Sequence, residues 1–219
     1  MNIFIDIETI PGQASGLLDD FRAAVKAPGQ YTKPESIQKW LDENRESEAR
    51  AQWLKTSFDG AVGQIVAISY ATDLEGSTEF VTDLDPASEK DLLQSVWAKL
   101  DELADNERVC IVGHNIIGFD IPFLWKRSIV HQARPPLWFP RNPKPWNDYV
   151  FDTMCEWDLD KRISMDNLCK ALGIPGKGDI SGADVWPMIQ EGKFEEVARY
   201  CMADVNRTRK IHRAMTFQS

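Results

Sequence analysis

The first ten residues, MNIFIDIETI, set two carboxylates into an apolar segment that alternates like a β-strand. Asp6 and Glu8 are two residues apart, so both side chains project from one face of such a strand. The opposite face carries Ile3, Ile5 and Ile7. One interpretation is that the acids simply face solvent, and a D-x-E pattern alone has many false matches. However, a first strand of an α/β sheet is usually central and covered, so two acids on it require a cleft.

Two later segments carry acids in comparable positions. Asp120 follows a buried strand predicted over 108–115 and opens a helix, where its alternative role is only that of a helix cap. Tyr200 and Asp204 lie four residues apart in a predicted helix, so they share one face of it. The alternative there is an ordinary buried tyrosine beside a surface aspartate. The cations that follow, including Arg207, are expected on a mostly solvated face.

Acids on a first strand, at a strand-to-helix junction and on a late helix can converge at one edge of a sheet. Three or four carboxylates close together repel one another unless divalent cations lie between them. Mg²⁺ and Mn²⁺ prefer oxygen ligands and bridge to phosphates. Two such ions about 3.5–4 Å apart stabilise the attacking and leaving oxygens in phosphodiester hydrolysis. The acids therefore predict a metal-dependent nuclease.

The composition narrows the class of protein. The chain has 219 residues, of which 43% are hydrophobic, so it fits one domain with a real core. It has no apolar run near the roughly 20 residues of a membrane span and no basic signal-peptide start, so we expect a cytoplasmic protein without membrane contact. The net charge of −9 argues against a non-specific nucleic-acid clamp, but not against a nuclease that reaches phosphates through metal ions. The four cysteines lack metal-ligand spacing, which argues against zinc.

The order of the predicted elements indicates a mixed α/β sheet covered by helices. After the first strand come a hairpin, an amphipathic helix, the strand 108–115, a second helix, a short strand at 149–154 and further helices. Residues 13 to about 60 are different, because they are charged and helical in pattern. We interpret them as a helical insertion between the first two strands of a single domain spanning residues 1–219.

Three motifs together resemble a known family. DIET, then N-x-x-x-F-D from Asn115 to Asp120, then Y-x-x-x-D from Tyr200 to Asp204 resemble the exonuclease motifs of the DEDD (DnaQ-like) 3′–5′ exonucleases. The tyrosine is typical of the DEDDy branch. The stretch 167–209 is similar to predicted stand-alone exonucleases related to the proofreading domain of family-B DNA polymerases. The resemblance implies a ribonuclease H-like fold, with a mixed five-stranded sheet, its first strand central, flanked by helices.

The resemblance also implies a site. Two divalent ions, Mg²⁺ or Mn²⁺, would be held by the four acids Asp6, Glu8, Asp120 and Asp204. Tyr200 would position the attacking water, because an ordinary tyrosine has a pKa of about 10 and is a poor base at neutral pH. The implied reaction is stepwise release of nucleoside 5′-monophosphates from a 3′ end.

Four further residues are candidates for substrate contact, and three of them have a structural alternative. Thr9 follows the first motif and is expected near the terminal nucleotide. Asn115 is expected to bind sugar or phosphate, or else only to stabilise its turn, and Phe119 to stack on a base, or else to pack in the core. Lys177, in a glycine-rich loop, is expected to contact phosphate, or else to be an exposed lysine. Asp152, at a strand end, is a candidate to support the metal ligands indirectly.

Single-stranded DNA is the favoured substrate, and the alternatives remain open. One is a catalytically weak nuclease-fold subunit that binds within a DNA repair or replication complex. Another is an RNA-processing exonuclease. Retention of all four acids and the tyrosine favours the enzyme. The sequence identifies no polymerase or repair partner.

Overall fold

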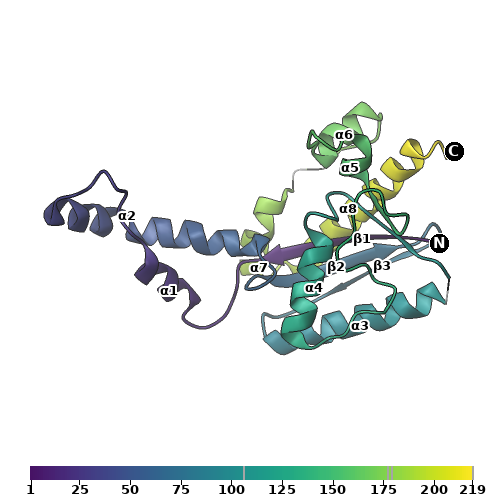
Figure 1. The fold of residues 1–219 in the computed structure, drawn as a ribbon. Coiled ribbons are helices and arrows are strands. Elements are labelled where there is room, and N and C mark those ends of the chain that lie inside the picture. The colour runs from purple at the N-terminus through teal and green to yellow at the C-terminus, as the bar shows by residue number, and fades with distance from the viewer. Residues whose placement is uncertain (106, 177, 179, 219) are drawn as a thin grey trace.

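The computed structural model describes residues 1–105, 107–176, 178 and 180–218. Five strands form one mixed sheet in the order β3-β2-β1-β4-β5 (Figure 1). The strands are β1 (Asn2–Ile10), β2 (Gln64–Ala71), β3 (Gly76–Phe80), β4 (Cys110–Gly113) and β5 (Val150–Asp152). Strand β1 pairs antiparallel with β2 and parallel with β4, so it is central. The predicted ribonuclease H-like α/β class is confirmed.

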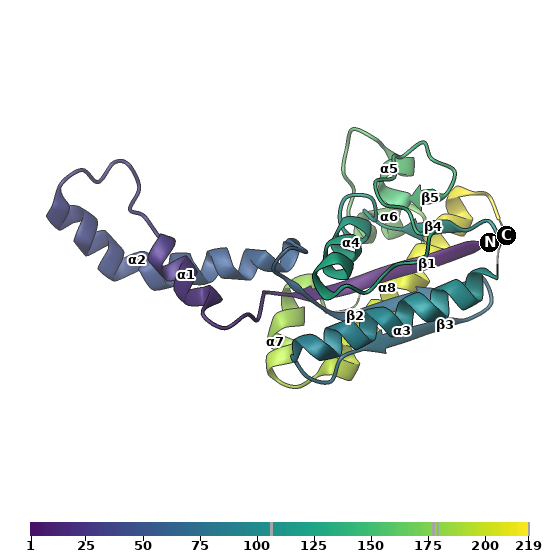
Figure 2. The same cartoon turned by 60° about the horizontal axis from the view of Figure 1, so that its bottom comes forward.

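Helices cover both faces of this sheet (Figure 2). They are α3 (Pro86–Ala104) and α4 (Asp120–His131) on one face and α8 (Phe194–Met215) on the other. Ile5 of β1 belongs to the main core with Leu93 of α3, whereas Phe4 belongs to a second cluster with Val205 of α8. Because side chains alternate along a strand, the acids of β1 share the face of Phe4. The two acids of the first motif therefore lie on the face that α8 covers.

The remaining helices are shorter or lie outside these layers. They are α1 (Leu17–Ala24), α2 (Pro34–Leu54), η1 (Lys55–Phe58), α5 (Thr153–Trp157), α6 (Met165–Ala171), η2 (Gly182–Asp184) and α7 (Val185–Gln190). Helices α1 and α2, which with η1 we call the helical arm, extend away from the sheet (Figures 1 and 2). At the base of the arm Trp53 donates a 2.8 Å hydrogen bond to the Gly12 carbonyl and packs edge-on against Trp186. In the described part of the chain, no helix has the length and apolarity to cross a bilayer.

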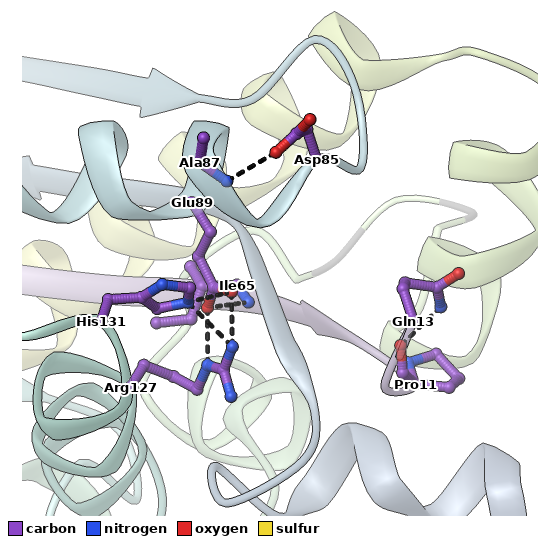
Figure 3. Close-up of polar contacts among 8 residues, drawn as sticks. All are labelled: Pro11, Gln13, Ile65, Asp85, Ala87, Glu89, Arg127 and His131. Atoms are coloured by element: carbon purple, nitrogen blue, oxygen red, sulfur yellow. Dashed lines mark hydrogen bonds and ion pairs between the residues drawn. The ribbon is translucent and has the colours of Figure 1, made fainter. Parts of the chain in front are cut away.

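A buried ion network joins α3, α4 and β2 (Figure 3). The Glu89 carboxylate accepts two hydrogen bonds from Arg127, at 2.8 and 2.7 Å, and one from the Ile65 backbone N–H at 2.9 Å. The His131 ring lies 2.9 Å from the same carboxylate. Burial alone would raise the pKa of Glu89, but the hydrogen bonds from His131 and Arg127 outweigh it and hold that pKa below its ordinary value. The network anchors α4, which begins at Asp120.

Candidate metal centre

The acid pair of β1 lies inside the protein. Glu8 is buried and Asp6 is half-buried. The pairing of β1 with β2 shifts register between Glu8 and Thr9, directly after the two acids. Ligand atoms of Asp6, Glu8 and Cys201 all lie within 4.8 Å of one another. The sequence predicted the acid pair, whereas the thiol beside it was missed, because Cys201 follows Tyr200 without any local motif of its own.

Asp120 reaches the backbone of β1 between these two acids. Its Oδ1 accepts a 3.1 Å hydrogen bond from the backbone N–H of Ile7, the residue between the two acids. Strand β4 pairs with β1 only as far as Phe4, so Asp120 takes the place of a ladder partner beyond the end of that pairing. The helix-cap interpretation of Asp120 is wrong, since Phe119 is the cap residue of α4 and Asp120 is the first residue within the helix.

Helix α8 supplies the third motif. Tyr200 and Asp204 are both buried, and between them Cys201 places its sulfur 3.4 Å from the Asp6 carbonyl oxygen and 3.5 Å from Asp6 Oδ2. Asp204 Oδ1 accepts a hydrogen bond from Arg207, whose side chain is only 16% exposed. The expectation of a solvated Arg207 is therefore wrong. The three motif segments, separate in sequence, meet between β1, α4 and α8.

The electrostatics show how much negative charge is gathered here. Burial, followed by the neighbouring Asp6 carboxylate, raises the pKa of Asp120 well above its ordinary value. Burial, followed by the charges of Asp6 and Glu8, likewise raises the pKa of Cys201. The carboxylates of the three motifs supply oxygen donors, which fit a hard divalent cation such as Mg²⁺ or Mn²⁺.

Two of the substrate-contact candidates border these acids. The Thr9 hydroxyl donates a 2.7 Å hydrogen bond to the Ser57 carbonyl of η1. The Phe119 ring lies between Phe58 and Phe123, at centroid distances of 6.4 and 5.5 Å. Phe58 is 73% exposed, so the arm presents an aromatic ring beside Phe119 where it joins the sheet. Sequence reasoning missed this neighbour, because nothing local links residue 58 to the motifs.

The other two candidates differ in what the structure says of them. Asn115 has a left-handed backbone, with φ of 61°, and its backbone N–H donates to Asp152 Oδ1 at 2.9 Å. A Cβ at Gly118 would lie 2.6 Å from Asn115 Oδ1, so the side chain of Asn115 folds over its own turn. This contact supports the turn-stabilising role that we set beside substrate binding. Lys177 lies outside the described residues.

A comparison with protein families decides the affiliation. A family model for a predicted 3′–5′ exonuclease related to the exonuclease domain of PolB matches residues 51–217. The chain belongs to this family. Membership places it among the 3′–5′ exonucleases, which hydrolyse phosphodiester bonds. Asp120, Tyr200 and Asp204 lie within the matched region of this exonuclease, whereas Asp6 and Glu8 precede it.

Comparisons with curated proteins and with solved structures do not extend this family assignment. No curated protein matches the sequence. Among solved structures, exonuclease I of E. coli in complex with a 5cy-dT13 oligonucleotide is similar, at 15% sequence identity and a TM-score of 0.40. The alignment covers 99% of this chain and 42% of that one, so the chain spans about two fifths of that protein's length.

Proposed function

We propose that this exonuclease removes nucleotides stepwise from the 3′ end of single-stranded DNA and releases nucleoside 5′-monophosphates. Asp6, Glu8, Asp120 and Asp204 would hold two divalent ions, Mg²⁺ or Mn²⁺. When bound, such ions activate water and stabilise the charge that develops on the phosphate. The observation that carries the proposal is the hydrogen bond from the Ile7 backbone N–H to Asp120, which ties that acid to the backbone between Asp6 and Glu8, 113 residues away from Ile7 in sequence.

The side chains around the acids then have separate tasks. Tyr200 is buried one helical turn before Asp204, and its hydroxyl would orient the attacking water. The ring of Phe119 would stack on a base close to the 3′ end, while Thr9 would lie near the terminal nucleotide. Asn115 would shape the turn that leads to Asp120. Lys177 would contact phosphate.

The charge balance favours contact with only a few nucleotides of the nucleic acid. The chain carries 25 basic and 34 acidic side chains, so a long electrostatic footprint on a phosphate backbone is unfavourable. An exonuclease that holds a few nucleotides and bridges their phosphates through metal ions has no need of such a footprint. Removal of 3′ termini from single strands would suit a role in DNA repair in the cytoplasm.

The decisive experiment follows degradation of a 5′-labelled single strand in Mg²⁺ or Mn²⁺. We expect a ladder that shortens from the 3′ end, which Asp6→Asn and Asp204→Asn abolish. Asp42→Asn is the matched control, because it neutralises an exposed acid of the arm. Internal cleavage, or activity that survives in both site variants, would refute the proposal.

The same assay separates the alternatives. An RNA strand of identical sequence degraded faster than DNA would indicate an RNA-processing enzyme. Binding of the strand without turnover in either metal would indicate a binding subunit. A duplex with a recessed 3′ end, tested in parallel, measures the preference for single strands.

A further inference from the structure

The last residue of β5 carries a carboxylate that the proposed reaction does not use. Asp152 is 2% exposed, although it lies at the end of a strand. Parallel pairing of β5 with β4 sets Asp152 opposite Gly113, the last residue of β4. A buried carboxylate is costly unless hydrogen bonds satisfy it, so its partners indicate why it is there.

Both oxygens of Asp152 are occupied by backbone N–H groups. Oδ1 accepts from Asn115 at 2.9 Å and from Met154 at 3.0 Å, while Oδ2 accepts from Ile117 at 3.0 Å. Oδ1 also lies 3.5 Å from the Cys155 nitrogen, as expected for the cap of α5. One side chain thus caps a helix and clamps a turn that lies 35 to 37 residues earlier in the chain.

The clamped turn leads directly into Asp120. Its first residue, Asn115, holds a left-handed backbone, and its carbonyl accepts from the Phe119 N–H at 2.9 Å. The Ile116 carbonyl accepts from the Ile121 N–H at 3.0 Å, which ties the turn to the first turn of α4. Asp120 therefore follows a turn that is held at residues 115 and 117, because the backbone N–H of each donates to Asp152.

We propose that Asp152 is a positioning residue for the metal centre. It fixes the turn 115–119 so that the Asp120 carboxylate faces Ile7 between the two acids of β1. Groups that orient metal ligands without touching the metal typically contribute 10–100-fold to metal affinity or activity. This inference rests on the proposed function, because it assumes that Asp120 is a ligand.

Asp152→Asn removes the clamp selectively. The remaining carbonyl oxygen can still accept from Asn115 and Met154, but an NH₂ group then meets the Ile117 N–H. Two donors face each other, and the turn loses one of its anchor points. We expect the half-saturating Mn²⁺ concentration to rise about tenfold, with a smaller fall in kcat at saturating metal.

Asp85→Asn is the matched control. Asp85 also caps a helix, accepting from Ala87 at 2.8 Å (Figure 3), and this cap belongs to α3, not to the elements that carry the turn and the acids. The Asp85→Asn variant makes the same chemical change at a helix cap, so its effect measures the loss of helix capping alone. We expect it to leave Mn²⁺ affinity unchanged. Should Asp152→Asn fail to fold, Asp152→Glu keeps both acceptor oxygens one methylene away and should weaken Mn²⁺ binding in the same direction.

Calorimetric Mn²⁺ binding and exonuclease rates, measured side by side, distinguish the possible outcomes. Weaker Mn²⁺ binding in the Asp152 variant, with binding unchanged in Asp85→Asn, supports the inference. Wild-type Mn²⁺ affinity in a folded Asp152 variant overturns it while the proposed function stands. A wild-type chain that binds no Mn²⁺ and degrades no 3′ end overturns the proposed function, and the inference with it.

Discussion

The five-stranded sheet and the helices that cover it, which we call the body, contain an arginine that donates two hydrogen bonds to a glutamate, and so does the helical arm. The surroundings of the two pairs differ. In the body, Arg127 and Glu89 meet at 2.8 and 2.7 Å, and both side chains are buried. In the arm, Arg22 and Glu46 meet at 2.6 and 2.8 Å, but the side chain of Arg22 is 37% exposed and that of Glu46 is 65% exposed. The geometry of an ion pair therefore does not by itself set its contribution to stability, because desolvation and screening by water also determine that contribution.

The same contrast holds for apolar burial. Helix α3 of the body buries seven of its residues, whereas α1, all of which the structure describes, buries none and α2 buries only Ala49. The arm therefore has little core of its own. We expect the body to carry most of the stability and the four acids of the site, and changes in α1 and α2 to have small effects.

The largest expected effect follows removal of the buried cation. Arg127→Met leaves the buried Glu89 charge without its arginine, so the free energy of unfolding should fall by about 3–5 kcal/mol. Adding Glu89→Gln removes that charge while keeping an acceptor for the Ile65 N–H, so the double variant should recover part of the loss. Urea unfolding measures both, and a double variant no more stable than Arg127→Met would contradict this account.

A cavity in the body core should cost nearly as much. Leu100 of α3 is fully buried, so Leu100→Ala should lower the free energy of unfolding by about 2–5 kcal/mol. Leu41 of the arm is half-buried, and Leu41→Ala should cost about 1 kcal/mol. Equal shifts of the two urea midpoints would show that the arm is integral to the core.

Acid should weaken the body through Glu89. Because its folded-state pKa lies below the ordinary value of 4.5, the unfolded chain takes up the proton first as pH falls. The stabilisation is thus present above pH 4.5 and is lost as pH falls through the folded-state pKa. Glu89→Gln should remove this part of the pH dependence of unfolding. A Glu89→Gln profile parallel to that of wild type would exclude the buried pair as its source.

The smallest effect is expected for the exposed pair. Arg22→Ala breaks a contact that water screens on most sides, so neither the unfolding midpoint nor the rate of 3′ shortening should change measurably. Thermal unfolding and the strand-degradation assay test this together. A clear loss of activity in Arg22→Ala would give the arm a function that its packing does not indicate.

Local pattern was sufficient for much of the fold. Alternation along the first ten residues predicted β1, and the amphipathic pattern after the predicted hairpin predicted α3, because each follows from side chains within a few residues of one another. The helical character of residues between β1 and β2 was also legible from their charge pattern. The buried network of Glu89 and Arg127 was not, since the two residues lie 38 positions apart and look like surface charges in sequence.

The candidate site likewise has features that the sequence predicted and features that only the structure showed. The sequence by itself determined which acids occupy apolar elements, and their order in three motifs indicated the family. Only the tertiary structure decided that Asp120 bonds to Ile7, 113 residues away, and that Cys201 lies against Asp6, 195 residues away. These contacts depend on how α4 and α8 are seated on the sheet. That seating is set by packing of the whole core, which no local periodicity encodes.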